Sequence, residues 1–393
     1  MRILMLSQGR TVDDQPSFHH AFQHAESEGR RIEFRNIPYL GFAAEHGNAA
    51  LWAEILRVNR EFEPDVVFFQ FFQHECLCGD IEGSDPTACI LQLKAAENHP
   101  LIFGSQGDPF QPNRFRPWVR LPTRPMMAVV RNADAFFSTS MGTLADYWVR
   151  QGGRNVIFLP HAYANQNFDC MIEDRRGCEY DAVMVCSIGL SRVRPLGSAI
   201  QVAKRWSDAT ALWRRYGKRF AVFGRGWQRH PAYKGVLSFR DQVAIYKSSR
   251  ICVDACAPVS EMYYASDRPF FVAGSGSFLV QRYTPRFETM FQAGRHIEFA
   301  TSTREVVSAC DRLLNLEDND ADVRRTATLD LVRAHHCVAH RVDTIISVAE
   351  ALRSCRGKGL SAEEAQREIR LWHFLPEIDI EKERQYAVRN WVG

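Results

Sequence analysis

The sequence predicts an α/β protein with two Rossmann-like domains and a helical extension at its C-terminal end. Short apolar segments alternate with amphipathic helical segments along the chain, as in parallel sheets that are covered by helices. The alternation restarts after a polar connector at 173–179, and a chain of 393 residues is long enough to bury two cores. We therefore expect one domain at 1–172, a second at 173–355 and a helical extension at 356–393.

The first half contains a series of apolar segments that we predict to be strands. Their ranges are 2–6, 32–37, 66–72, 101–104, 135–139 and 155–159. Helices are expected between them at 18–30, 48–61 and 142–151, where apolar residues recur with helical spacing. The largely apolar run at 66–72 (VVFFQFF) is typical of a central parallel strand, which is buried on both faces.

The second half repeats this order of elements. Strands are predicted at 180–187, 220–223, 236–239, 251–255, 278–280 and 296–299. Helices are predicted at 196–216, 241–249 and 302–314, the last of them capped by Ser302. One long helical region is expected at 323–351, and a last helical segment starts at 361.

The composition is that of a globular protein, with 46% hydrophobic and 24% charged residues. A net charge of +3 is too small to indicate nucleic-acid binding by itself. No segment approaches the roughly 18 apolar residues of a membrane span, and the first residues lack the apolar run of a signal peptide. The 11 cysteines show no zinc-site spacing, so we expect reduced thiols, no metal site and a cytoplasmic protein, either monomer or homodimer.

The segment 250–281 is the part of the sequence that most directly suggests a ligand site. A predicted strand is followed by Ser266 and Asp267, which can cap the helix that begins after them. The free amides of that first turn face a loop where an anion can sit, and Arg268 supplies a guanidinium able to hold two phosphate oxygens. An ordinary capped helix in an α/β domain accounts for the same residues equally well.

Candidate catalytic residues lie in the first half. Asp108 follows a predicted central strand, at the end where doubly wound domains bind ligands, and it can accept a proton from a hydroxyl or bind that hydroxyl. An Asx turn before Pro109 accounts for it equally well. His19 and His20, near the start of the first helix, can serve as a base with Asp108 as orienting partner. For at least one of these histidines, a surface or packing role is favoured.

The segment 113–127 interleaves arginines with Trp118, prolines and methionines. We interpret it as a loop that can stack on the ring of an acceptor or hold a phosphate. A membrane-surface contact, single-stranded nucleic acid or packing against the second domain would use the same residues.

Three segments of the second half carry a family resemblance: 223–227 (FGRGW), 234–239 (KGVLSF) and 266–280 (SDRPFFVAGSGSFLV). They are similar to glycosyltransferases of the two-Rossmann-domain (GT-B) type, most closely to the spore-maturation CgeB-like group. In that group the third segment reads Arg-x-Phe-Glu-x-x-Ala-x-Gly-Gly-Phe, and Arg268, Phe270, Gly276 and Phe278 are in register with it. The segment 158–162 (FLPHA) resembles the interdomain segment of the family.

The resemblance implies a metal-independent hexosyltransferase with its active site in a cleft between the domains. It implies a nucleotide-sugar as co-substrate, linked to UDP, GDP or dTDP, and no other cofactor. The donor is expected in the second domain. The acceptor is expected in the first domain and can be a small molecule, a glycan or modified nucleic acid, without integral membrane contact. Analogy with the family favours retention of the anomeric configuration.

A transferase without a metal must stabilise its diphosphate leaving group with cations and amides. The residues that we expect to bind the donor are Gly189, Arg192, Arg194, Arg225, Gly226, Val236, Leu237, Glu261, Ser266, Asp267 and Arg268. Those that we expect to bind the acceptor are Gln8, Arg10, Asp108, Trp118 and His161.

Not all of these residues require a ligand to account for their presence. Arg192 and Arg194 can be solvated loop arginines, whereas Arg225, between two glycines, is the stronger candidate. The segment 234–237 can line the base pocket with main-chain groups or be a buried strand end. His161 is better placed to shape the domain interface than to catalyse.

The sequence departs from the family at two positions where the resemblance expects carboxylates. The residue that holds the donor ribose is replaced by Phe271, and an earlier acid is replaced by Tyr263. Another acid, such as Glu261 or Asp267, must then hold the ribose. This departure motivates two alternative functions: a nucleotide-sugar-binding protein without transfer activity, and a sugar-nucleotide epimerase on the same fold.

Overall fold

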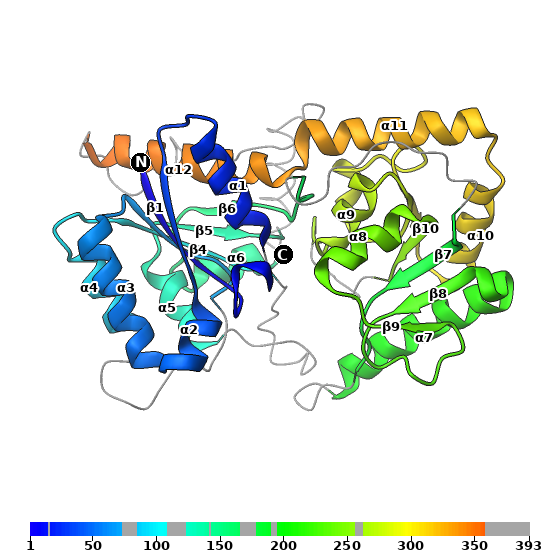
Figure 1. Cartoon of the computed structure of the whole chain (residues 1–393), viewed down its shortest axis with the longest axis horizontal. Coiled ribbons are helices and arrows are strands. Elements are labelled where there is room, and N and C mark those ends of the chain that lie inside the picture. The colour runs from blue at the N-terminus through cyan, green and yellow to red at the C-terminus, as the bar shows by residue number, and fades with distance from the viewer. Residues whose placement is uncertain are drawn as a thin grey trace.

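The computed structural model describes residues 1–14, 16–72, 85–107, 123–140, 143–165, 178–189, 195–255 and 262–357, except for the side chains of 143, 146, 195–198 and 240. These residues form two α/β units whose sheets lie side by side (Figure 1). Each sheet has six strands, and every pair of neighbouring strands is parallel. The predicted fold class is therefore confirmed.

The first sheet has the strand order β2-β1-β3-β4-β5-β6. Its strands are β1 (Arg2–Ser7), β2 (Glu33–Pro38), β3 (Val66–Phe69), β4 (Leu101–Ser105), β5 (Ala135–Ser138) and β6 (Val156–Phe158). The helices of this half are η1 (Val12–Asp14), α1 (Pro16–Ser27), α2 (Tyr39–His46), α3 (Asn48–Phe62), α4 (Pro86–Lys94), α5 (Arg124–Asn132) and α6 (Thr143–Arg150). The central strands are buried on both faces, as the apolar run at 66–72 predicts.

The second sheet has the strand order β12-β11-β10-β7-β8-β9. Its strands are β7 (Tyr180–Val185), β8 (Phe220–Phe223), β9 (Tyr233–Gly235), β10 (Ser249–Asp254), β11 (Phe278–Arg282) and β12 (Glu298–Ala300). The helices are α7 (Pro195–Tyr216), η3 (Gly217–Arg219), α8 (Phe239–Lys247), α9 (Arg268–Gly274), η4 (Phe287–Thr289), α10 (Thr303–Leu314) and α11 (Asp318–His335). Ser302 caps α10 as predicted, because its side chain accepts a hydrogen bond from Glu305 N.

Both sheets start from an inner strand and extend in two directions. β1 has β2 on one side and β3 on the other, and β7 likewise lies between β8 and β10. The carboxyl ends of β1 and β3, and those of β7 and β10, are therefore topological switch points, where open α/β sheets bind ligands. The arrow of β7 points toward the first domain (Figure 1). At the same boundary, the ring of Phe158 at the end of β6 lies 5.6 Å from that of Tyr263, which follows β10.

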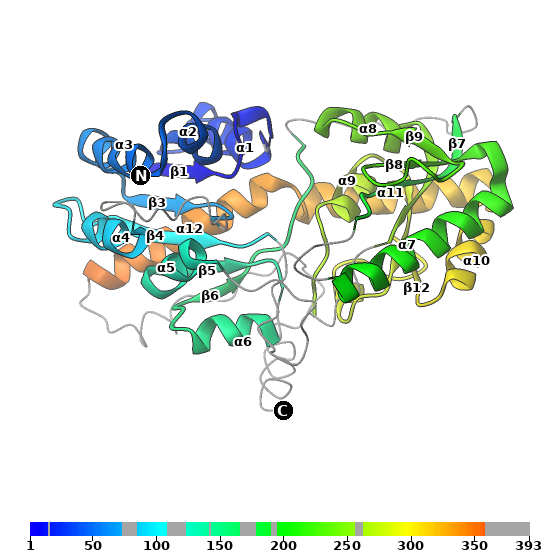
Figure 2. The same ribbon diagram turned by 90° about the horizontal axis from the view of Figure 1, so that it is seen from below.

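The last described helix, α12 (Val338–Gly357), returns to the first domain. Figures 1 and 2 show α11 along the second domain and α12 along the first. The sequence-based boundaries place this helix in the second domain, but α12 forms ion pairs with first-domain residues, through Asp343 with Arg30 and through Arg353 with Asp65. Over the part of the chain that the structure describes, the chain therefore crosses between the domains after β6 and again at the α11–α12 junction.

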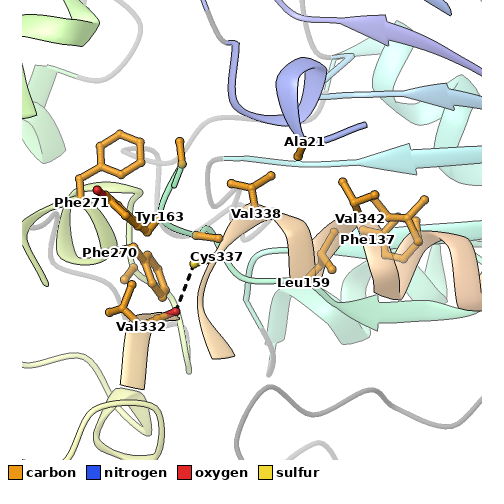
Figure 3. Close-up of a cluster of buried hydrophobic side chains, with 14 of the residues drawn as sticks. Ala21, Phe137, Leu159, Tyr163, Phe270, Phe271, Val332, Cys337, Val338 and Val342 are labelled. Atoms are coloured by element: carbon orange, nitrogen blue, oxygen red, sulfur yellow. Dashed lines mark hydrogen bonds between the residues drawn. The ribbon is translucent and has the colours of Figure 1, made fainter. Parts of the chain in front are cut away.

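The two crossings are bonded to each other. Tyr163 N donates to His336 O (2.7 Å) and Val338 N donates to Tyr163 O (3.0 Å). The fully buried Arg341 donates to Pro160 O (2.9 Å) and His161 O (3.0 Å), and burial lowers its pKa to about 9. Figure 3 shows Val338 and Val342 of α12 beside Leu159 and Phe137, and Tyr163 beside Phe270 and Phe271. One apolar cluster thus runs continuously through the domain junction.

Some predicted elements are wrong in position. The helical region predicted at 323–351 is interrupted at His336 and Cys337, because their main chain pairs with Tyr163. The strand predicted at 236–239 is β9 (Tyr233–Gly235), and the chain then turns toward α8, which Ser238 caps. The segment 113–127 is predicted as one loop, but its last four residues begin α5, and 108–122 lie outside the described residues. The extension expected at 356–393 is described only to 357.

Candidate functional site

The switch point of the second sheet carries an ion pair between a buried carboxylate and a partly buried guanidinium. Asp254 ends β10 and is 1% exposed, and its carboxylate accepts a hydrogen bond from Arg268 at the start of α9. Although burial alone would lower it, the Asp254 carboxylate raises the pKa of Arg268 well above its ordinary value. Arg268 Nε and Asp254 Oδ2 have no hydrogen-bond partner among the described residues. Arg268 is therefore largely neutralised by the protein before any phosphate binds.

A second arginine joins the ends of the two strands at this switch point. Arg205 of α7 donates from Nε to Ala255 O (3.0 Å) and from Nη1 to Ser187 O (2.6 Å). These carbonyls follow β10 and β7 respectively, so the guanidinium fixes the spacing of the two strand ends. The sequence analysis missed Arg205, because it lies in the middle of a long helix without a motif. It also missed Asp254, whose only signal is a charged residue at the end of an apolar strand.

A tight glycine turn follows β8 and presents Arg225. A Cβ on Gly224 would lie 2.3 Å from Cys186 O, and one on Gly226 would lie 2.0 Å from Ile188 O. Both glycines have positive φ, +132° and +92°, so the turn requires glycine for its conformation as well as its contacts. The turn therefore lies directly against the chain that leaves β7.

The main chain of Arg225 is held on both sides while its side chain extends into solvent. Arg225 N donates to Ser187 Oγ (3.1 Å), and Ile188 N donates to Arg225 O (2.8 Å). The exposed guanidinium makes no hydrogen bond or ion pair with another described residue. Arg225 thus has a fixed main chain and a cation that no described residue neutralises, at the carboxyl ends of β7 and β8.

The other predicted donor residues lie around this edge in different settings. Gly189 is exposed just beyond β7, Val236 is 56% exposed just beyond β9, and Leu237 is half-buried against the apolar cluster. Asp267 occupies the N-cap of α9, but its side chain makes no capping bond, so the predicted side-chain cap is absent at that residue. Ser266 Oγ is buried without a partner among the described residues. Arg192, Arg194 and Glu261 lie outside the described residues.

The two positions that lack the family carboxylates are both buried. Phe271 is 3% exposed and packs edge-to-face on Phe239, with ring centroids 5.5 Å apart. Tyr263 is 7% exposed, has a positive φ of 63° and accepts a hydrogen bond from Arg286 Nε at its hydroxyl (3.4 Å). In this chain both positions contribute apolar packing at the domain junction, and neither offers a carboxylate to a ribose.

The predicted acceptor residues of the first domain are spread over several elements. Gln8 is half-buried after β1, and the exposed Arg10 has its main-chain N bonded to Asp14 Oδ2 (2.7 Å). His161 donates from Nε2 to Gly107 O (3.0 Å) and so joins the first crossing to the end of β4. Asp108 and Trp118 lie outside the described residues.

The remaining predicted catalytic residues are the two histidines of α1. His19 Nδ1 is hydrogen-bonded to Asn36 Nδ2 (3.2 Å), and its ring packs 5.6 Å from that of Phe34. Burial, and to a lesser extent the neighbouring His20, lowers the pKa of His19, so its ring is uncharged near pH 7. The structure holds His19 against β2, which favours packing for this residue. The half-buried His20 lies beside it, with ring centroids 5.6 Å apart.

Two general features bear on the kind of site. In the ranges that the structure describes, no three His, Cys, Asp or Glu side chains are grouped to hold a metal ion. Over the same part of the chain, no helix combines the length and the apolar character that crossing a bilayer requires.

The second domain is similar in sequence to a known protein family. Residues 203–347 match the model of a protein family described as "Glycosyl transferase-like", which covers most of the second domain and the start of α12. Among curated proteins, none is significantly similar to the chain in sequence.

Solved structures of the same architecture cover nearly the whole chain. Sucrose-phosphate synthase from Thermosynechococcus elongatus has a TM-score of 0.58 and 8% identity, covering 90% of this chain and 100% of its own. HepE from Anabaena, solved in complex with UDP and glucose, has a TM-score of 0.56 and 11% identity over 90% of this chain and 100% of its own. A protein from Listeria monocytogenes described as a UDP-N-acetylglucosamine 2-epimerase has a TM-score of 0.52 and 11% identity, over 92% and 98%. The chain therefore has the GT-B fold.

Proposed function

We propose that the protein is a glycosyltransferase that moves a sugar from a nucleoside diphosphate donor to an acceptor hydroxyl without a metal ion. The observation that carries the proposal is Arg225, whose main chain is fixed at the carboxyl ends of β7 and β8 and whose exposed guanidinium no described residue neutralises. It lies inside the segment 203–347 that matches the glycosyltransferase-like family model. The donor then binds to the second domain and the acceptor to the first.

The chemistry requires a cation at this place. As the bond between the anomeric carbon and the phosphate oxygen breaks, its electron pair remains on the diphosphate, which gains negative charge. The acceptor oxygen forms the new bond to the anomeric carbon, and its proton passes to a base or to the departing diphosphate. Arg225 offers several N–H donors in a planar fork that fits phosphate oxygens. Arg268 contributes less, because Asp254 already accepts from it.

We infer that UDP-sugars are the donors to test first. HepE of Anabaena binds UDP and UDP-glucose in its solved structures, and it shares the fold of this chain. GDP- and dTDP-sugars are tested beside them.

Donor turnover tests the proposal. The protein is incubated with UDP-, GDP- and dTDP-hexoses in EDTA, without an added acceptor, and release of nucleoside diphosphate is followed. We expect one nucleotide class to be hydrolysed to diphosphate and free sugar, with water as the acceptor and with no loss of rate in EDTA. Tight donor binding without hydrolysis would instead indicate a protein that only binds nucleotide-sugars.

A sugar-nucleotide epimerase is the second candidate function. The observation that favours it is the similarity in fold to the epimerase-like protein of Listeria monocytogenes, over 92% of this chain. An isomerised nucleotide-sugar among the products, detected by NMR of the same incubations, would support this candidate. If no isomerised nucleotide-sugar forms and nucleoside diphosphate is released, the result would support the transferase instead.

A further inference from the structure

The carboxyl ends of β1 and β3 carry two buried oxygen atoms without a hydrogen-bond partner among the described residues. They are Ser7 Oγ and Gln70 Oε1, and both side chains are 2% exposed. The two residues continue the β1–β3 pairing beyond Leu6 and Phe69, and Gln70 N donates to Leu6 O (3.1 Å). Because side chains alternate along a strand, Ser7 and Gln70 lie on the same face, the one that packs against α1. This is the switch point of the first sheet.

The described side chains at the neighbouring strand ends, up to Gly107, are also uncharged. Ser105 Oγ accepts from Phe71 N (3.3 Å), and Gln106 Nε2 donates to Ser138 Oγ (3.0 Å). Ser138, Gln106 and Ser140 are fully buried, and Gln106 Oε1 and Ser140 Oγ again have no partner among the described residues. The second sheet differs, because its switch point holds an ion pair. The first domain therefore presents hydroxyls and amides where the second presents charge.

The type of atom left without a partner restricts the ligand. An amide oxygen only accepts hydrogen bonds, so Gln70 Oε1 can be satisfied only by an O–H or N–H group. A phosphate or carboxylate ion supplies no donor, and its charge would not be balanced by buried neutral groups. A sugar hydroxyl both donates and accepts, and it can bond Gln70 Oε1 and Ser7 Oγ at the same time.

We propose that Ser7 and Gln70, with the uncharged strand ends beside them, form an acceptor subsite for a neutral, polyhydroxylated ligand such as an uncharged sugar. The inference builds on the proposed glycosyltransferase function and specifies its acceptor. The reactive hydroxyl belongs to a ligand whose part at this subsite carries no phosphate and no carboxylate.

Binding of free sugars to the donor-free protein tests the subsite. Saturation-transfer NMR compares the methyl glycosides of glucose, galactose and mannose with glucose 6-phosphate and glucuronate. We expect saturation transfer to at least one neutral glycoside and none to the two anions. In Gln70→Met, which keeps the size of the side chain, the affinity should fall about tenfold, as expected for one lost hydrogen bond with a poorly satisfied partner.

The melting temperatures of the variants distinguish a binding role of Gln70 from a structural role. Because Gln70 Oε1 is buried without a partner, Gln70→Met should melt at a temperature no lower than the parent protein. Gln281→Met is the matched control: Gln281 is fully buried in β11 of the second sheet, and both of its side-chain polar atoms lack a partner among the described residues. This control should leave glycoside binding unchanged.

Three results would overturn the subsite. They are stronger saturation of the anionic sugars than of the neutral ones, loss of binding in Gln281→Met but not in Gln70→Met, and no saturation of any neutral glycoside up to its solubility limit. These outcomes do not depend on donor turnover. A protein that binds neutral sugars but never releases a nucleoside diphosphate would keep the subsite and refute the transferase.

Discussion

Arg225→Ala should abolish most donor binding without affecting the fold. The main chain of Arg225 is held by Ser187 and Ile188, and those bonds do not involve its side chain. An exposed side chain of this kind contributes within about 0.5 kcal/mol to stability when it is replaced. The variant should therefore be as stable as the parent protein.

The loss in binding follows from the hydrogen bonds that the guanidinium would make to the diphosphate. A hydrogen bond to a charged group contributes about 1.5–3 kcal/mol, and each 1.4 kcal/mol is about a tenfold change in affinity. We expect Arg225→Ala to weaken binding of the nucleoside diphosphate by about 10- to 100-fold. The affinity of Arg225→Lys should lie between those of the parent protein and Arg225→Ala, because lysine keeps the charge but lacks the planar guanidinium.

Isothermal titration with UDP, GDP and dTDP measures this effect. Arg229→Ala is the matched control, because Arg229 is an exposed arginine in the same connection, beyond the buried Trp227. It should bind the nucleotide as the parent protein does. Equal affinities for the parent protein, Arg225→Ala and Arg229→Ala would refute the reasoning that places the diphosphate at this turn.

Three further predictions concern the same domain. Asp254→Asn leaves the partly buried Arg268 without its ion-pair partner and should lower the free energy of unfolding by about 3 kcal/mol, measured by urea denaturation. An unchanged midpoint would contradict a stabilising role of this pair. Gly226→Ala places a Cβ against Ile188 O in a left-handed backbone conformation. The free energy of unfolding should therefore fall by at least about 1–2 kcal/mol. A melting temperature equal to that of the parent protein would show that the turn is looser than described. Phe271→Glu introduces the carboxylate that the family resemblance expects, but buries it among aromatic rings. The stability should therefore fall by about 4 kcal/mol or more, with no gain in nucleotide affinity. Tighter nucleotide binding in calorimetry would refute the packing role of Phe271.

The order of the strands could be predicted from the sequence because most of them carry a local signal, whereas the short helices α2, α4 and α5 were not predicted. The buried parallel strands are apolar runs, and Ser302 marks the start of α10. The break between α11 and α12 has no such signal. The helix breaks at His336 and Cys337, where Tyr163, far away in the sequence, donates to His336 O and accepts from Val338 N. The return of α12 to the first domain depends on equally distant contacts, such as Asp343 with Arg30.

The candidate site was predictable only in part, for a similar reason. The glycines on both sides of Arg225 point to a tight turn, and the structure shows why each is needed. The sequence does not show that Asp254 neutralises Arg268, because this pairing depends on the tertiary positions of β10 and α9. It also gives no sign of Ser7 and Gln70, since single polar residues at the ends of apolar strands are common. Their buried, partnerless oxygens become visible only with the folded arrangement of the strands among the described residues.

Hydrogen–deuterium exchange with the tightest-binding nucleoside diphosphate tests the central claim most directly. Because the donor is proposed to bind at the carboxyl edge of the second sheet, peptides that contain 186–189 and 224–226 should be protected by the nucleotide. The exchange rates of peptides that contain Ser7 or Gln70 should not change until a neutral sugar is added. Protection confined to the first domain, with no change at 224–226, would contradict the assignment of the two domains.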